Sequence, residues 1–259
     1  MPWASLIIPC FNNLRYTRAC VESVQRWTSP PFELILIDDG STDGTGAYAR
    51  ALARRCREAR VIANPRNLGF AASVNRGMKA ARGDRLVWLN NDALMTPGWL
   101  EALSACAESS RAVGAAGPCT NEIPGLQRIS VPYRGARGLD SFAAAWGLRH
   151  QGRSRSVPYL TGFCLLVKRE AFRAVGGLDE ELRGGCFEDL DYCLRLRRAG
   201  FELRLAEEAF VHHWGRRTFR RLAGVGRRVA ESRRLFMEKW RRSPDLLAEI
   251  DPDLACADL

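Results

Sequence analysis

Short apolar runs alternate with amphipathic stretches along the first third of the chain, and no other feature restricts the fold as strongly. The stretches between the apolar runs carry apolar side chains at helical spacing. Four expected strands and four expected helices follow one another, at residues 6–8, 14–26, 33–37, 42–57, 61–63, 70–81, 85–89 and 97–108. Because strands that alternate with helices form a parallel sheet covered on both faces, residues 1–115 are expected to fold as an α/β, Rossmann-like half-domain.

Regular patterning is lost between residues 118 and 158, where Gly, Pro and Arg are scattered and only residues 141–146 indicate a helix. It returns as a strand, two helices and a further strand, at residues 159–167, 169–175, 188–199 and 201–205. These elements predict a mixed α/β half of the same domain over residues 116–215. We expect the irregular segment to be either a connection that faces a substrate or a partly mobile loop.

Composition excludes several classes of protein. With 46% apolar residues in 259, the chain can bury a large core, so a disordered or fibrous protein is not expected. No apolar stretch is long enough to span a bilayer, and the run at residues 6–10 is too short for a signal peptide, so we expect a cytoplasmic protein. The nine cysteines are scattered and include no C-x-x-C pair, which favours reduced thiols over disulfides or a zinc site.

The net charge of +10 is concentrated near the C-terminus. Residues 216–242 contain eleven Arg or Lys and two acids, while the rest of the chain is nearly neutral. Apolar residues lie between these charges: Phe219, Leu222, Val225, Val229, Leu235, Phe236 and Trp240. We expect residues 216–259 to form a basic helical tail. Its helix either lies on an anionic membrane, at the inner face of that membrane, or packs on the body of the protein with its arginines solvated.

Two adjacent acids, Asp38 and Asp39, follow the expected strand at residues 33–37. Open parallel sheets bind ligands at the carboxyl ends of their strands, so these acids are well placed for a ligand. A turn and a helix cap would explain Ser41 to Asp43 but not the acid pair. The segment after the first strand, residues 9–13, contains no glycine, which argues against a dinucleotide-binding fingerprint, and no P-loop occurs.

Three polar residues, Asn90, Asn91 and Asp92, follow the fourth expected strand. A carboxylate there can hold Mg²⁺ or Mn²⁺, which prefer oxygen ligands and complete their shell with water and a diphosphate. Asn and Asp also end strands in turns, and taken alone the triplet favours a turn. A tandem pair, His212 and His213, ends the apolar run at residues 209–211 and offers further metal ligands.

Three acids open the helix expected at residues 188–199: Glu188, Asp189 and Asp191. Helix N-termini favour carboxylates, so one acid is explained by capping. The adjacent pair Glu188 and Asp189 also suits a general base whose neighbour tunes or orients it. The spacing alone does not decide between a general base and a helix-capping acid.

Taken together, these sites resemble the family 2 glycosyltransferases, and particularly their rhamnosyltransferase-like bacterial members, over residues 5–219. The motifs occur in the family's order: residues 8–12 (IPCFN), 37–45 (IDDGSTDGT), 64–70 (NPRNLGF), 89–92 (LNND), 176–180 (GGLDE) with 188–191 (EDLD), and 211–213 (VHH). The resemblance implies a GT-A fold and an enzyme that moves a hexose or deoxyhexose from a nucleotide-diphosphate sugar to an acceptor hydroxyl, with inversion. It also implies a role in the synthesis of surface polysaccharide or glycoconjugate.

The resemblance assigns residues to the donor and to the acceptor. The implied contacts of the donor nucleotide are Pro9, Phe11, Asn12, Asp38, Asp39, Asn67, Gly69, Asn75 and Asn91. A turn and a helix-packing Asn are the structural alternatives for Asn67, Gly69 and Asn75. Gly162, Phe163 and Asp191 are assigned to the acceptor side, and the acceptor is expected to be a saccharide, a lipid-linked saccharide or a protein.

Asp92 matches the last acid of the family's D-x-D motif, which implies a divalent cation, Mn²⁺ or Mg²⁺, on the donor diphosphate. The chain departs from that motif because Asn90 stands in place of its first acid, and His212 or His213 is expected to supply the missing ligand. Asp189 matches the catalytic base, with Glu188 as the second candidate.

Two rival functions remain at this point. A nucleic-acid-binding protein is supported only by the basic tail, and we do not expect nucleic acid as a partner. A sugar nucleotidyltransferase would carry a glycine-rich phosphate loop with Arg and Lys after the first strand, where this chain has Asn12 and Asn13.

Overall fold

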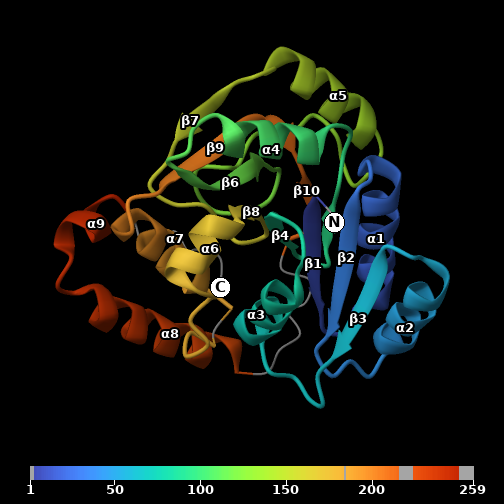
Figure 1. Ribbon diagram of the computed structural model, residues 1–259, viewed down its shortest axis with the longest axis horizontal. Helices are drawn as coiled ribbons and strands as arrows, with labels where there is room; N and C mark the ends of the chain where they lie inside the picture. The colour runs from blue at the N-terminus through green and yellow to red at the C-terminus, as the bar shows by residue number, and fades with distance from the viewer. Residues whose placement is uncertain (1–2, 184, 216–223, 251–259) are drawn as a thin grey trace.

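The computed structural model describes residues 3–183, 185–215 and 224–250, which fold around one eight-stranded sheet (Figure 1). The strand order is β3-β2-β1-β4-β8-β6-β9-β7. The strands are β1 Ala4–Cys10, β2 Phe32–Asp38, β3 Ala59–Ala63, β4 Arg85–Leu89, β6 Val113–Cys119, β7 Ser154–Ser156, β8 Cys164–Lys168 and β9 Glu202–Phe210. A separate two-stranded ribbon pairs β5 Ala93–Leu94 with β10 His212–His213.

The first four strands of this order are parallel, and the second half of the sheet is mixed. Strand β8 runs antiparallel to both β4 and β6, β9 runs parallel to β6, and β7 closes the edge antiparallel to β9. The sheet therefore continues without a break through both halves of the chain. The predicted α/β fold, with a parallel first half and a mixed second half, is confirmed.

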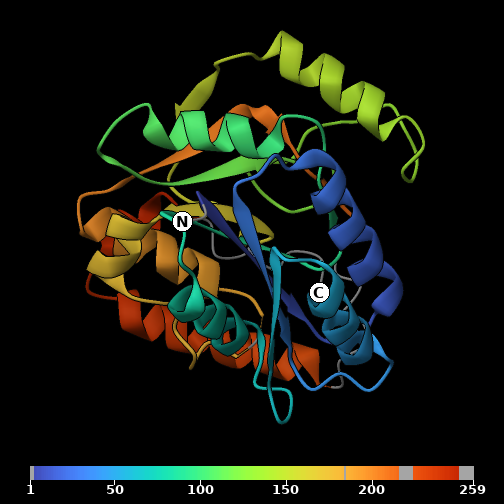
Figure 2. The same cartoon turned by 45° about the vertical axis from the view of Figure 1, so that its right-hand side comes forward.

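Strands β1 and β2 send alternate side chains to opposite faces, as the two-residue period of a strand requires. Ile7 and Ile35 belong to one core cluster together with residues of α3, α7 and α8, whereas Leu6 and Leu34 belong to a second cluster with α1, α2 and α4. Figure 2 shows these helices on the two sides of the sheet. The helices are α1 Leu14–Trp27, α2 Thr45–Arg55, α3 Phe70–Ala80, α4 Trp99–Glu108, α5 Leu139–Arg149, α6 Arg169–Val175, α7 Glu188–Arg198, α8 Val225–Trp240 and α9 Pro244–Ala248.

The expectation of an irregular segment at residues 118–158 is right for residues 120–138, which contain no named helix or strand, but the segment also holds regular elements. Strand β6 ends inside it, the helix expected at residues 141–146 is the longer α5, and β7 follows. Strand β6 has the sequence VGAAGPC, whose small residues and Pro118 give no strand signal. Packing against other parts of the fold requires small residues in β6. A Cβ atom on residue 114, for example, would lie 2.7 Å from the Cβ atom of Phe201.

The strands that flank the site also have bounds that differ from those expected. The strand expected at residues 159–167 begins only at Cys164, and residues 159–163 before it form a segment that contains a turn. The strand expected at residues 201–205 continues to Phe210.

Helix α8 of the basic tail packs its apolar face on the body of the protein. Val229, Phe236 and Trp240 are buried, and the Phe236 ring lies 5.4 Å from the ring of Phe187, just before α7. Of the two interpretations of the tail, the described part follows the second. None of the helices within the described ranges is both long enough and apolar enough to cross a bilayer.

Candidate functional site

One pocket lies where the loops after β1, β2 and β4 meet the start of α7. The carboxyl ends of these parallel strands share one edge of the sheet, so residues far apart in the sequence come together there. Asp39, Asp92 and Asp189 all line this pocket. The lining residues are Pro9, Cys10, Phe11, Asp39, Asn67, Gly69, Phe70, Asn90, Asn91, Asp92, Ile123, Pro124, Thr161, Gly162, Phe163, Arg183, Gly185, Cys186, Glu188, Asp189, His213, Val225 and Arg228.

The loop after β1 is held to the loop after β2 through Asn12. Its backbone N–H donates to Ser41 Oγ at 2.9 Å, and its Oδ1 accepts from the backbone N–H of Thr42 at 2.8 Å. Asn12 adopts a left-handed φ of 54°, which Asn tolerates better than most residues. Pro9 and Phe11 of this loop line the pocket, whereas Asn12 braces it from outside the lining.

Asp39 is a buried carboxylate that shapes the pocket wall. Its Oδ1 accepts from Asn64 Nδ2 at 2.7 Å and from the Leu68 N–H at 2.8 Å, and its Oδ2 accepts from the Gly69 N–H at 3.0 Å. Gly69 has a φ of 95°, which favours glycine, and it lines the pocket with its neighbour Asn67. Asp39 thus fixes the turn that forms one side of the pocket.

Asp92 and His213 meet because the short strands β5 and β10 pair next to them, with Ala93 opposite His213. His213 Nε2 lies 3.1 Å from Asp92 Oδ1, and His213 Nδ1 lies 2.8 Å from the carbonyl oxygen of Glu122. Burial opposes the charged imidazolium, but the neighbouring Asp92 carboxylate and its hydrogen bond raise the pKa of His213.

The side chains at this point supply only some of the ligands that a divalent cation needs. Asp92 supplies a carboxylate oxygen and His213 an imidazole nitrogen, both of which are ligands for Mn²⁺. Within the described ranges, no group of three or more His, Cys, Asp or Glu side chains is arranged to hold a metal ion. A cation here would therefore need further ligands from the bound substrate and from water.

Glu188 and Asp189 open α7 on the other side of the pocket. Asp189 Oδ2 accepts from the Gly162 N–H at 2.8 Å, and the carbonyl oxygen of Gly162 accepts from Trp88 Nε1 at 2.9 Å. A Cβ atom on residue 162 would lie 3.0 Å from the Cβ of Asp189 and would press on it, so glycine favours this close approach. Burial raises the pKa of Asp189 above its ordinary value.

The Glu188 carboxyl is buried more deeply than that of Asp189. It is 4% exposed, and its Oε2 has no hydrogen-bond partner among the described residues. Burial, and next the charge of Asp189, raise the pKa of Glu188 well above its ordinary value. The surroundings therefore disfavour the charged form of Glu188 more strongly than that of Asp189, whose carboxylate accepts two backbone N–H bonds.

Several predicted site residues lie outside the pocket lining. Asp38 Oδ1 accepts from the Ser41 N–H at 3.1 Å and closes the turn after β2. Asn75 holds the backbone of Leu178 through two hydrogen bonds, of 2.9 and 2.7 Å. In this structure Asn75 therefore has the alternative role of a packing residue, because it joins α3 to the loop before α7.

Two further predicted residues contact other parts of the molecule. Asp191 is fully buried and contacts Arg195, Lys239 and Trp240 rather than the pocket. His212 lines a neighbouring pocket, and its Nδ1 lies 3.0 Å from the hydroxyl of Tyr133. Burial, and next the neighbouring His213, lower the pKa of His212 to about 4, so its imidazole is neutral. Of the two histidines, His213 is the one beside Asp92.

The pocket also contains residues that the sequence did not single out. Ile123 and Pro124 come from the irregular segment for which a substrate-facing role is one expectation, so this segment does reach the pocket, and Arg183 follows the GGLDE motif. Arg228 belongs to the basic tail, where it is one of many arginines. No local pattern distinguishes any of them, because each reaches the pocket through the tertiary fold.

Comparison with known proteins shows what the chain as a whole is similar to. Residues 5–176 match the model of glycosyl transferase family 2. The chain is 30% identical over 214 residues to an N-acetylglucosaminyl-diphospho-decaprenol L-rhamnosyltransferase of Mycobacterium tuberculosis, a match that covers 72% of this chain and 68% of that protein. It is 31% identical over 214 residues to protein y4gI of Sinorhizobium fredii, where it spans 77% of this chain but only 23% of the relative.

Solved structures show the same fold. A mannosyltransferase from Pyrobaculum calidifontis, in complex with GDP-Man and Mn²⁺, superposes with a TM-score of 0.65 at 17% identity. The superposition covers 98% of this chain and 67% of that protein.

Proposed function

The chain belongs to glycosyl transferase family 2, and from this premise we propose that it moves a sugar from a nucleoside-diphosphate donor to an acceptor hydroxyl with inversion. The observation that carries the proposal is the shared pocket of Asp39, Asp92 and Asp189. Residues suited to a nucleotide, two potential ligands of a cation and the candidate base Asp189 line the same cavity. Each corresponds to one requirement of the reaction.

In the proposed reaction, Asp189 accepts the proton of the acceptor hydroxyl. The acceptor oxygen attacks the anomeric carbon from the face opposite the diphosphate, and the bond from that carbon to the phosphate oxygen breaks. The hydrogen bond from Gly162 orients the Asp189 carboxylate toward the pocket. A divalent cation, held by Asp92 and His213, would offset the charge that develops on the leaving diphosphate.

The donor side is proposed to lie between the loop after β1 and the turn that Asp39 holds. Pro9, Phe11, Asn67 and Gly69 line that side, and Asn91 extends it toward Asp92. On the acceptor side we propose Gly162 and Phe163, which lie next to Asp189 in the lining. The Mycobacterium relative, by its name, acts on a lipid-linked N-acetylglucosaminyl diphosphate, and we propose a lipid-linked saccharide as the acceptor here, in surface polysaccharide or glycoconjugate synthesis.

Nucleic-acid binding has less support than sugar transfer. Within the described part of the tail, Arg234 pairs with Glu231 at 2.7 Å and with Glu238 at 3.1 Å, and Lys239 pairs with Asp191 at 2.8 Å. These two charges are therefore neutralised by partners within the molecule.

A thermal-shift screen tests the proposed function. GDP, UDP and dTDP and their sugars are added with and without Mn²⁺, because a ligand that binds the native state raises its melting temperature. We expect a cation-enhanced rise for at least one of these compounds. A protein whose melting temperature responds to none of them would not be a transferase of this kind.

A further inference from the structure

Helix α8 reaches the proposed active site although it belongs to the basic tail. At its first turns, Val225 and Arg228 line the same pocket as Asp189. At its last turn, Trp240 is buried against the body. One helix therefore joins a pocket-lining arginine to an anchor at its opposite end.

The charge of the pocket makes this arginine significant. Four carboxyl groups line the cavity, at Asp39, Asp92, Glu188 and Asp189, and the guanidinium groups come only from Arg183 and Arg228 among the described lining residues. A donor diphosphate carries several negative charges, which the carboxylates would repel. Guanidinium groups bind phosphate oxygens with two parallel N–H bonds, so an arginine here suits the diphosphate.

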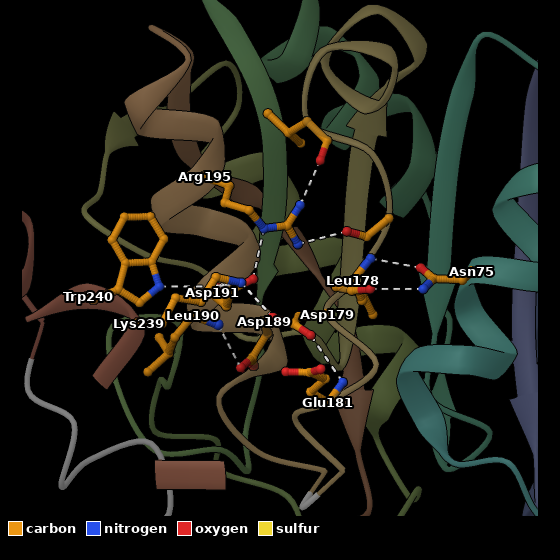
Figure 3. Close-up of polar contacts among 12 residues, drawn as sticks. Asn75, Leu178, Asp179, Glu181, Asp189, Leu190, Asp191, Arg195, Lys239 and Trp240 are labelled. Atoms are coloured by element: carbon orange, nitrogen blue, oxygen red, sulfur yellow. Dashed lines mark hydrogen bonds and ion pairs between the residues drawn. The ribbon is translucent and has the colours of Figure 1, made fainter. Parts of the chain in front are cut away.

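The anchor of α8 is centred on Asp191, whose side chain is fully buried (Figure 3). Its Oδ1 accepts from Trp240 Nε1 at 3.0 Å and lies 2.8 Å from Lys239 Nζ, both on α8. Its Oδ2 accepts from Arg195 Nε at 2.8 Å, on its own helix α7. Lys239 also lies 2.5 Å from Asp179 Oδ2 in the loop before α7.

This anchor is adjacent to the catalytic turn. Asp191 lies two residues after Asp189 on α7, and Phe236 of α8 packs on Phe187, which precedes the acid pair. The contacts of Asp191 therefore connect the position of α8 to the turn that carries the proposed base.

We propose that α8 is a strap that places Arg228 on the diphosphate of the donor, and that Asp191, through Trp240 and Lys239, fastens this strap to the catalytic helix. The inference rests on the proposed function. It gives a specific role to a helix for which the composition indicates only a basic charge. Arg228 is the binding residue. Asp191, Lys239 and Trp240 are positioning residues.

The binding test compares Arg228→Gln with Arg227→Gln, which removes an equal charge from the preceding, exposed residue outside the pocket lining. Isothermal titration measures the Kd of GDP, UDP and dTDP with Mn²⁺, and of the matching monophosphates. We expect R228Q to weaken diphosphate binding by about tenfold or more, as for loss of a charge-assisted hydrogen bond. Binding of the monophosphate should change much less, and R227Q should match wild type in both.

The strap is tested by a double-mutant cycle with Trp240→Phe, which retains an aromatic ring but removes the N–H donor to Asp191. We expect W240F to weaken diphosphate binding. The R228Q/W240F double variant should bind no more weakly than R228Q alone, because both changes remove the same contact between Arg228 and the diphosphate. Lys239→Gln serves as a second anchor variant if W240F does not fold.

The outcomes separate the two proposals. If wild type binds none of the nucleotides, the proposed function fails, and the strap with it. If wild type binds a diphosphate but R228Q binds it like R227Q, the assignment of Arg228 is overturned while the proposed function stands. Fully additive effects of R228Q and W240F would overturn the strap.

Discussion

His213 Nε2 lies 3.1 Å from Asp92 Oδ1, at the point where the second half of the chain meets the first. His213 Nδ1 lies 2.8 Å from the carbonyl oxygen of Glu122, and because a carbonyl can only accept, Nδ1 must donate. The raised pKa of His213 reflects the form in which Nε2 also carries a proton and donates it to Asp92. A divalent cation held by Asp92 and Nε2 would take the place of this proton, which is the electrostatic reason for placing the ion there.

The first prediction concerns this cation. Asp92→Asn removes its anionic ligand, so the rise in melting temperature that a nucleoside diphosphate gives should no longer depend on Mn²⁺. Asp84→Asn, which changes an exposed acid outside the pocket, is the matched control. An undiminished Mn²⁺ effect in D92N would place the cation elsewhere.

Glu188 is predicted to reduce stability at neutral pH. Its folded-state pKa is raised above the unfolded value by burial and by Asp189, so the unfolded state loses its proton first as pH rises. The resulting loss of folding stability is absent below the ordinary pKa of Glu. It grows as the pH rises from that value toward the raised pKa of Glu188. Glu188→Gln removes it, and we expect the melting temperature to rise at pH 8, by about 2–4 °C for each kcal/mol relieved. The gain should be smaller at pH 5, and an equal gain at both pH values would count against a protonated Glu188.

The raised pKa of Asp189 predicts the acid limb of the rate profile. A general base must be ionised, and burial makes Asp189 take up its proton at a higher pH than an ordinary Asp. We expect kcat/KM to fall tenfold per pH unit on the acid side, starting above the usual Asp range of about 4. Initial rates across a pH series with donor below its KM measure this limb. A profile that stays flat down to pH 4 would contradict the assignment.

Asp39 is predicted to act on both stability and donor binding. Three N–H donors converge on its carboxylate, from Asn64, Leu68 and Gly69. Asp39→Asn replaces one acceptor oxygen by an amide that donates, so at least one buried N–H loses its partner at a cost of about 1–3 kcal/mol. We expect a lower melting temperature and a higher Kd for the nucleoside diphosphate. Glu22→Gln, on the exposed face of α1, should change neither quantity.

The first four strands and the loops that follow them could be predicted because their signals are local. Apolar periodicity marks β1, β2 and β4, and the polar residues of the site come directly after these strands. Their convergence then follows from the geometry of a parallel sheet. The pocket lining of Asp39 and Asp92 was accessible to sequence reasoning for this reason.

The remaining features depend on contacts between distant segments. Strand β6 consists of small residues that the neighbouring strands and Phe201 require, and its own sequence carries no strand pattern. The placement of Asp191 is also nonlocal. Residues two apart on a helix do not face each other, so Asp189 and Asp191 point to different surroundings, and only α8 shows where the second one lies.

The most direct test of the shared pocket uses Asp189→Asn. Isothermal titration of the nucleotide sugar with Mn²⁺ measures donor binding, and single-turnover transfer by the same sample measures chemistry. If Asp189 is the base beside a donor held by other residues, the Kd should stay within about twofold of wild type while turnover falls by about 10²–10⁴-fold. Transfer by D189N at the wild-type rate would contradict the account, and so would loss of donor binding in a folded D189N protein.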